Sequence, residues 1–110
     1  MNITTRSLGP ILAIDIAGKL DTTTSTMALE QLLLHLDASP DKVLVCLEPL
    51  EFVSSAGLRV VLRVAKQMRG YGGVLKVSGA RGMVKEVLEI SGFDSLLDLH
   101  EEEDQALSSF

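Results

Sequence analysis

Two adjacent serines, Ser54 and Ser55, stand shortly before a glycine, Gly57, in the middle of the chain. A serine hydroxyl can act as a nucleophile, cap a helix or accept a phosphoryl group. An apolar run at residues 43–47 precedes the serines, and a segment without glycine or proline follows them at residues 58–69. The serines therefore join a predicted strand to a predicted helix. We therefore expect two hydroxyls at a helix N-terminus, beside free amides and the positive end of the helix dipole.

A nucleophilic role for Ser55 has little support from the surrounding sequence. The nucleophile of an α/β-hydrolase lies within GxSxG, and Val53 stands where the first glycine is required. The chain order Ser55, Asp94 or Asp98, and His100 imitates the order of a hydrolase triad. However, 110 residues are too few for a hydrolase sheet, and His100 lies among carboxylates. We expect no catalytic residue and no enzymatic activity.

Other kinds of chemical site are also not supported. The histidines, His35 and His100, have no His or Cys neighbour, and the single cysteine, Cys46, lies in an apolar run as a small buried side chain would. The glycines form neither GxxxxGK[ST] nor GxGxxG. Nucleic-acid readers stack bases on exposed aromatic side chains, and this chain has three Phe, one Tyr and no Trp. We expect no metal, no cofactor and no nucleic-acid partner.

The charged residues are unevenly distributed along the chain. The formal net charge is -5, but all charged side chains in residues 52–85 are basic, whereas residues 94–104 are strongly acidic. The basic residues of the first segment are Arg59, Arg63, Lys66, Arg69, Lys76, Arg81 and Lys85. The acidic residues of the second are Asp94, Asp98, Glu101, Glu102, Glu103 and Asp104. The overall charge therefore conceals a basic middle and an acidic tail.

The first half of the chain predicts strands that are joined by a helix. Residues 11–17 alternate between apolar and less apolar side chains, as a half-buried strand does. The hydroxyl-rich residues 22–26 predict a helix start, and leucines at helical spacing follow. Residues 43–47 have no polar face and predict a central strand that is covered on both sides. Strand, helix and strand in this order imply a crossover and parallel neighbours.

The segment after the serines predicts a helix at residues 58–69. It is long for a strand, and its apolar residues fit the i, i+3, i+4, i+7 spacing of a helix. Its apolar arc spans about 200°, whereas one core-facing stripe needs only about 100°. We therefore expect Val60 and Val64 to be exposed. The basic flank of this helix consists of Arg59, Arg63 and Lys66.

The second half predicts a strand at residues 74–77, a helix at 83–90, a short strand at 96–99 and an acidic helix. The predicted order is β-β-α-β-α-β-α-β-α, an α/β sandwich forming one domain over residues 1–110. No apolar stretch approaches the length of a membrane span, and the N-terminus lacks the pattern of a signal peptide. We expect a cytoplasmic protein that contacts no membrane.

A phosphoacceptor role fits the two serines better than catalysis does. A hydroxyl at an exposed helix start is accessible to a kinase, and the helix dipole favours a phosphate there. Such a phosphate adds about -1.5 to -2 charges to the surface beside the helix without unfolding it. Phosphorylation would therefore change what that surface can bind.

Four short segments, in this order and spacing, resemble a known protein family. They are GKLD at residues 18–21, FVSSAGL at 52–58 followed by RVVL at 59–62, GG at 72–73 before VL, and ISGF at 90–93. The family is that of the STAS domains, and among them the stand-alone bacterial anti-sigma factor antagonists. The resemblance covers nearly the whole chain. It implies an α/β fold, a STAS-like sandwich with a mixed, mostly parallel sheet of four to five strands and about four α-helices.

The resemblance implies that the protein works by partner switching. The unphosphorylated antagonist binds an anti-sigma factor, a serine kinase of the GHKL ATPase type, and so releases the sigma factor. The kinase then phosphorylates the antagonist with ATP, and a PP2C-type serine phosphatase restores it. The family's acceptor is the serine two residues before the loop glycine, which is Ser55 here. Several members have Asp just before the acceptor, where this chain has Ser54, so Ser54 is the alternative acceptor.

The resemblance also implies a partner-binding surface around the acceptor, on a chain that is monomeric when free. Asp21, in the GKLD segment, is expected near the acceptor, where it would contribute to recognition by the kinase. A different interpretation keeps the fold but changes the partner: a STAS regulatory module that controls a non-sigma target, such as a secretion or signalling assembly. The expected partner-binding residues are Asp21, Thr22, Ser54, Ala56, Gly57, Arg59, Val60, Arg63 and Val64.

Overall fold

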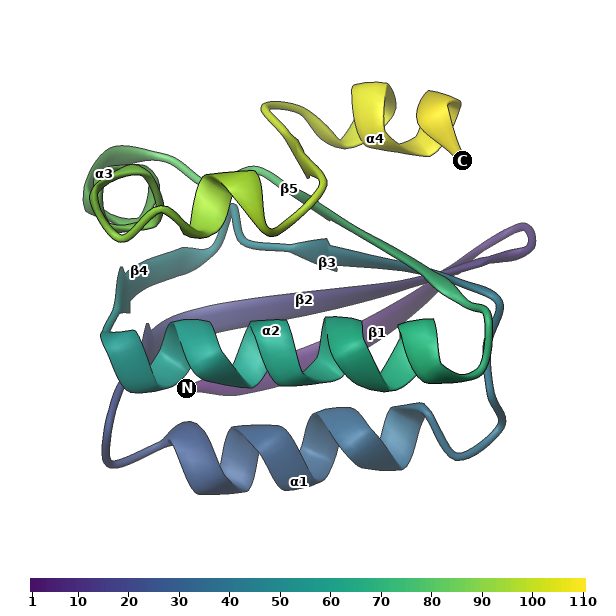
Figure 1. The fold of residues 1–110 in the computed structure, drawn as a ribbon, viewed down its shortest axis with the longest axis horizontal. Coiled ribbons are helices and arrows are strands. Elements are labelled where there is room, and N and C mark those ends of the chain that lie inside the picture. The colour runs from purple at the N-terminus through teal and green to yellow at the C-terminus, as the bar shows by residue number, and fades with distance from the viewer.

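A six-stranded mixed β-sheet forms the centre of the structure, a computed structural model that describes residues 1–110 (Figure 1). The strand order is β1-β2-β3-β5-β6, and β4 pairs separately with β2; β1 is antiparallel to β2, and all other pairs are parallel. The strands are β1 (Asn2–Leu8), β2 (Ile11–Leu20), β3 (Lys42–Cys46), β4 (Leu50–Val53), β5 (Val74–Ser78) and β6 (Leu99–His100). The helices are α1 (Ser25–His35), α2 (Ser55–Gly70), α3 (Gly82–Ile90) and α4 (Glu103–Ser109), with a 3₁₀ turn at Phe93–Ser95.

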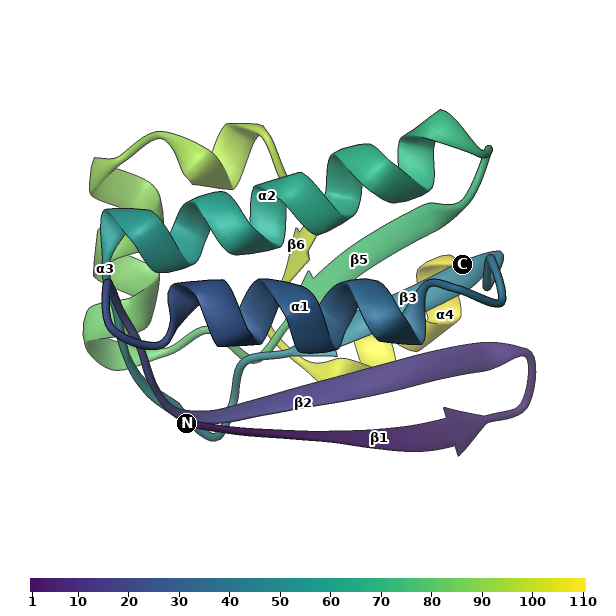
Figure 2. The same ribbon diagram turned by 90° about the horizontal axis from the view of Figure 1, so that it is seen from below.

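Helices cover both faces of this sheet. Helices α1 and α2 lie side by side on one face, and α4 lies on the other (Figures 1 and 2). The larger apolar cluster lies between the sheet and the α1–α2 pair, and a smaller one forms under α4 around Ala106. Strand β3 contributes to both, because Val43 and Val45 enter the larger cluster and Leu44 and Cys46 the smaller. The prediction of a central strand covered on both sides is confirmed.

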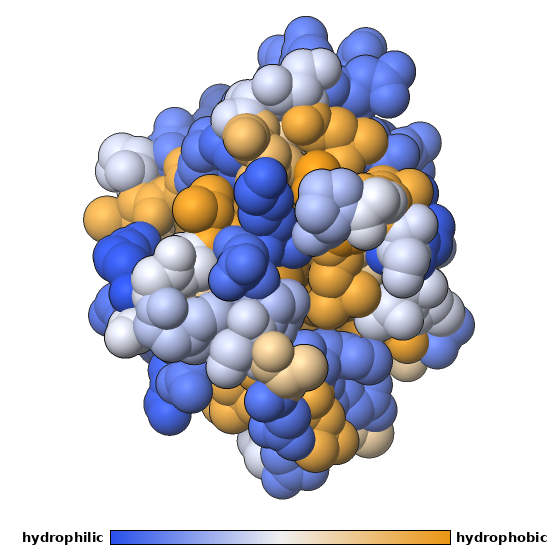
Figure 3. Space-filling model, turned by 90° about the vertical axis from the view of Figure 1, so that its right-hand side faces the viewer, coloured by the Kyte–Doolittle hydropathy of each residue, from blue (hydrophilic) through white to orange (hydrophobic).

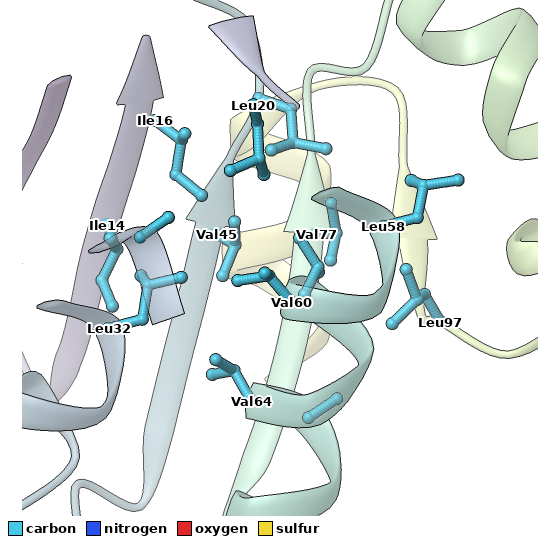
Figure 4. Packing of buried hydrophobic residues seen from close by; sticks show 14 of the residues in the cluster. Ile14, Ile16, Leu20, Leu32, Val45, Leu58, Val60, Val64, Val77 and Leu97 are labelled. Carbon is cyan, nitrogen blue, oxygen red and sulfur yellow. The ribbon is translucent and has the colours of Figure 1, made fainter. Parts of the chain in front are cut away.

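The predicted exposure of Val60 and Val64 is wrong. Their exposed fractions are 5% and 1%, and Figure 4 shows both side chains among the core residues between α2 and the sheet. The cause is the neighbouring helix, because α2 packs against the sheet on one side and against α1 along its flank (Figure 2). Two neighbours bury a wider arc than the single stripe assumed from sequence. The remaining flank of α2, with Arg59 and Arg63, is exposed as predicted.

Most predicted elements are present, with shifted bounds and one additional strand. Helix α2 begins at Ser55, three residues earlier than predicted, and the last strand is reduced to the two residues of β6, after the 3₁₀ turn. The sheet has six strands because residues 50–53 pair with the far end of β2, with a register shift between Gly18 and Lys19. Pairing with the distant strand β2, and not a local sequence pattern, defines this strand. The predicted fold class, a mostly parallel α/β sandwich with four helices, is confirmed.

None of the helices combines the length and the hydropathy that crossing a bilayer requires. At the end of the molecule opposite the start of α2, hydrophobic side chains reach the surface in several places separated by hydrophilic ones (Figure 3). The start of α2, where the two serines lie, is at the other end (Figure 1).

Candidate functional site

The pairing of β2 with β4 places the serine loop beside the GKLD segment. Leu20, at the end of β2, is in register with Val53, at the end of β4. The next amide, that of Ser54, donates a 3.0 Å hydrogen bond to the Leu20 carbonyl oxygen. Two loops that are distant in sequence therefore leave the same edge of the sheet together, and Asp21 lies next to the serines. This edge, beyond the C-terminal ends of parallel strands, is the usual position of functional sites in α/β folds.

Ser54 is the N-cap of α2. Its backbone is extended (φ -100°, ψ 174°), and its Oγ accepts a hydrogen bond from the Gly57 amide at 3.4 Å. Its carbonyl oxygen accepts the first bond of the helix, from the Leu58 amide at 2.9 Å. A serine in this geometry satisfies one of the amides that a helix start otherwise leaves without a partner. The Ser54 hydroxyl therefore has a structural role that accounts for its presence.

Ser55 differs from Ser54 because its hydroxyl makes no hydrogen bond. It is the first residue of α2, its side chain is exposed, and its hydroxyl makes no hydrogen bond within the protein. Arg59 lies one helical turn later, on the same side of α2, and its exposed guanidinium forms no ion pair. A phosphate on Ser55 would lie at the positive end of the helix dipole and four residues before a cation, an arrangement that stabilises a helix.

Close packing against β2 explains why residue 57 is a glycine. It is buried, and a Cβ built on it would lie 2.4 Å from the Leu20 carbonyl oxygen and 2.8 Å from the Leu20 Cγ. Only a residue without a side chain allows the first turn of α2 to approach β2 so closely. Gly57 therefore positions the loop, and its buried position leaves it little surface to offer a partner.

Asp21 organises the turn that precedes α1. Its carboxylate accepts hydrogen bonds from the Thr23 amide at 2.9 Å, the Thr23 hydroxyl at 2.7 Å and the Thr24 amide at 3.2 Å. These bonds, with that of the Thr23 hydroxyl foremost, lower the pKa of Asp21 below its ordinary value. The carboxylate thus stays ionised and held in place next to the serine loop, while Thr22 in the same turn is exposed.

A groove of about 230 Å³ lies between the first turns of α1 and α2. Val60 forms part of this groove, so its small exposed area is available to a ligand, whereas the predicted partner contact Val64 does not reach the surface. The α1 side was not predicted, because the hydroxyl cluster there was interpreted only as a helix start and no sequence pattern shows that α1 lies beside α2. The groove is lined by Ser25, Thr26, Leu29, Ala56, Arg59, Val60 and Arg63.

Comparison with known proteins finds similarity along nearly the whole chain. The family model described as the STAS domain matches residues 2–106. A Bordetella bronchiseptica protein named as an anti-sigma factor antagonist, BtrV, is 33% identical over 110 residues, which are 100% of this chain and 95% of that protein.

Solved structures share the fold at low sequence identity. The crystal structure of an anti-sigma factor antagonist from Mycobacterium paratuberculosis has a TM-score of 0.89 at 20% identity, over 98% of this chain and 92% of that one. The phosphorylated form of the Bacillus cell-fate determinant SpoIIAA has a TM-score of 0.72 at 15% identity, over 98% of each chain. The match of the family model over nearly the full length, together with this fold, shows that the chain belongs to the STAS domain family.

Proposed function

We propose that this protein is an anti-sigma factor antagonist that works by partner switching in the cytoplasm. When unphosphorylated, it binds an anti-sigma factor that is also a serine kinase of the GHKL ATPase type, and so releases the sigma factor. It is a binding regulator and not an enzyme. The observation that carries the proposal is the Ser55 hydroxyl at the first position of α2. It is exposed and makes no hydrogen bond, and it lies beside Arg59, which forms no ion pair. The name of the Bordetella relative supports the same role.

Ser55, not Ser54, is the phosphoacceptor in this proposal. The Ser54 hydroxyl accepts a hydrogen bond from the Gly57 amide, so a phosphate on Ser54 would disturb the cap of α2. The Ser55 hydroxyl has no bond to lose and is the more exposed of the two. Its Oγ attacks the γ-phosphorus of ATP on the kinase, ADP departs, and the hydroxyl proton passes to a base of the kinase. A PP2C-type phosphatase reverses the modification by hydrolysis, which returns the hydroxyl and releases inorganic phosphate.

The partner surface consists of the groove between α1 and α2 together with the two loops at the sheet edge. Arg59 and Arg63 stand exposed without ion pairs on its α2 side, so it favours an acidic partner surface. Asp21 and Thr22 lie at its other border and would contribute to recognition by the kinase. Val64 is excluded from the surface by its burial, and Gly57 acts by positioning the loop.

Phosphorylation acts on this surface through charge. A phosphate on Ser55 brings about -1.5 to -2 charges beside Arg59 and offsets the cation that would attract the partner. A new like-charge contact at 4 Å costs about 1 kcal/mol in water and about 4 kcal/mol near a protein surface. Because about 1.4 kcal/mol is a factor of ten in affinity, one or two such contacts release the partner. The fold itself need not change, since the dipole and Arg59 both favour the phosphate.

The proposal is tested by capture from a lysate of the source organism. The immobilised chain, a single STAS domain that is monomeric when free, is incubated with lysate, and the captured protein is identified by mass spectrometry. We expect an ATPase with serine kinase activity. After addition of ATP, we expect one phosphoryl group on the chain, at Ser55, and release of the partner.

A matched variant separates the acceptor from its neighbour. Ser55→Ala should capture the same kinase and retain it in ATP, whereas Ser54→Ala should still be phosphorylated. Phosphorylation of the Ser55→Ala variant at Ser54 would contradict the assignment of the acceptor. Recovery of no kinase, with or without ATP, would contradict the switch and favour a STAS module that regulates a non-sigma target.

A further inference from the structure

A row of basic side chains runs along the exposed side of α2 and continues beyond the groove at the start of this helix. Arg59 and Arg63 line the groove, and Lys66 and Arg69 follow them toward the end of α2. All four residues are exposed, and none of them takes part in an ion pair of the protein. We refer to Lys66 and Arg69, the two members outside the groove, as the distal patch.

Helix stability does not account for this row. Its members are four, three and three residues apart, which are the spacings at which side chains are neighbours on a helix. Like charges at such spacings destabilise a helix, and residues 52–85 contain no carboxylate to offset them. The negative end of the helix dipole favours Arg69 in the last turn, but it does not favour Arg63 in the middle of α2. The fold therefore bears a repulsion that an anion from outside the chain would relieve.

The surroundings of the distal patch leave its charge free and favour a protein as the source of the anion. Helix α1, which runs beside α2, and the loop after it carry the carboxylates of Glu30, Asp37 and Asp41, which are exposed and form no ion pair (Figure 2). Tyr71, directly after α2, donates its hydroxyl to the Pro40 carbonyl oxygen at 2.9 Å and is thereby held against the protein. Proteins that bind single-stranded nucleic acid need aromatic side chains that are free to stack on bases. The occupant that fits is a protein segment rich in Asp and Glu.

The distal patch lies too far from Ser55 for a phosphate there to neutralise it. At the rise of an α-helix, Arg59 lies about 6 Å from Ser55 along the axis of α2. Lys66 lies about 16 Å away along the same axis, and Arg69 about 21 Å away. Exposed charges more than about 8 Å apart are largely screened at physiological ionic strength. A phosphate on Ser55 therefore offsets Arg59 and leaves the attraction of the distal patch for an anion largely unchanged.

We propose that the distal patch is a docking site for an acidic segment of the anti-sigma factor, and that its attraction is the same in both phosphorylation states of Ser55. This inference rests on the proposed function, to which it adds a division of the α2 surface. Phosphorylation switches the part beside Ser55 and leaves the distal part constant. Exposed charges at the edge of an interface act mainly on the rate of association. The distal patch therefore steers the partner toward α2, and the state of Ser55 decides how long the partner stays.

The first test is an NMR titration of the ¹⁵N-labelled chain and of its Ser55→Asp variant with a blocked peptide that carries four glutamates. We expect the peptide to shift the amides of residues 65–70 in both chains with the same affinity, and more weakly as salt is added. A DNA pentanucleotide, which has the same charge as the peptide, serves as the comparison. The proposal is overturned if these amides do not shift, if their shifts are lost in Ser55→Asp, or if the DNA binds more tightly than the peptide.

The second test measures how fast the captured kinase associates with unphosphorylated variants at low salt. Lys66→Gln and Arg69→Gln each remove one cation from the distal patch, and Lys85→Gln removes an exposed cation from α3. We expect each distal variant to slow association by about twofold to fivefold and Lys85→Gln to leave it unchanged. Equal slowing by all three would show a general charge effect and overturn the site. Slowing by none, with a kinase that ATP still releases, would refute the distal patch and leave the switch intact, whereas capture of no kinase would overturn both.

Discussion

Replacing Gly57 with alanine tests whether the start of α2 is fixed by its close approach to β2. The new Cβ would lie 2.4 Å from the Leu20 carbonyl oxygen, well inside the 3.4 Å at which ordinary van der Waals contact begins. A backbone oxygen has no rotamer by which to move aside, so the first turn of α2 must shift away from Leu20. That shift lengthens the 3.0 Å hydrogen bond from the Ser54 amide to the same oxygen.

The size of the effect is the balance of three contributions. Overpacking a buried site costs about 1–3 kcal/mol, and the weakened hydrogen bond costs about 1 kcal/mol more. The higher helix propensity of alanine returns about 1 kcal/mol. We therefore expect Gly57→Ala to lower the free energy of unfolding by about 1–3 kcal/mol, which lowers the Tm by about 5–20 °C for a domain of this size.

The assay is thermal and urea unfolding followed by circular dichroism, with Gly70→Ala as the control. Gly70 ends the same helix, and a Cβ there meets no atom within 4 Å, so its replacement should leave the Tm unchanged or raise it slightly. If Gly57→Ala unfolds at the temperature of the wild type and of Gly70→Ala, the close approach does not constrain the loop and the reasoning is refuted.

Three further changes test other parts of the structure. Ser54→Ala removes the cap of α2 and should cost about 1 kcal/mol in urea unfolding, whereas Ser55→Ala should stay within about 0.5 kcal/mol of the wild type. Val64→Ala should cost about 1–3 kcal/mol by the same assay, because the side chain is 1% exposed; a cost near zero would indicate the exposed position expected from sequence. The hydrogen bond from Arg6 holds the pKa of Glu103 below its ordinary 4.5, so the stability it contributes is present above about pH 4.5 and is lost as the pH falls below it. Unfolding free energies measured from pH 6 to 3 should therefore fall less steeply for Glu103→Gln than for the wild type.

Much of the fold can be predicted because the patterns that define it are local. The fully apolar run at residues 43–47 predicted the central strand, and hydroxyl and apolar spacing predicted both long helices. The short strand β4 could not be predicted, because pairing with a distant strand defines it, and the last strand, predicted at residues 96–99, is present only at Leu99–His100. The exposure of Val60 and Val64 was misjudged for a related reason: the second neighbour of α2 is a helix that lies about thirty residues earlier in the chain.

The candidate site was predictable where single residues have distinctive chemistry. The serine pair and the basic flank of α2 were identified from residue type and spacing alone. The different roles of Ser54 and Ser55 required the hydrogen bonds, because both serines are compatible with a cap or an acceptor in sequence. The contribution of α1 to the groove required the packing of two helices, for which the sequence contains no local signal.

The affinity of the captured kinase for the chain phosphorylated at Ser55 tests the central claim most directly. It should be compared, by calorimetric titration, with the affinities of the unphosphorylated chain and of Ser55→Ala. We predict that phosphorylation weakens binding at least tenfold, while Ser55→Ala binds as the unphosphorylated chain does. Equal affinity of the phosphorylated and unphosphorylated chains would contradict the switch.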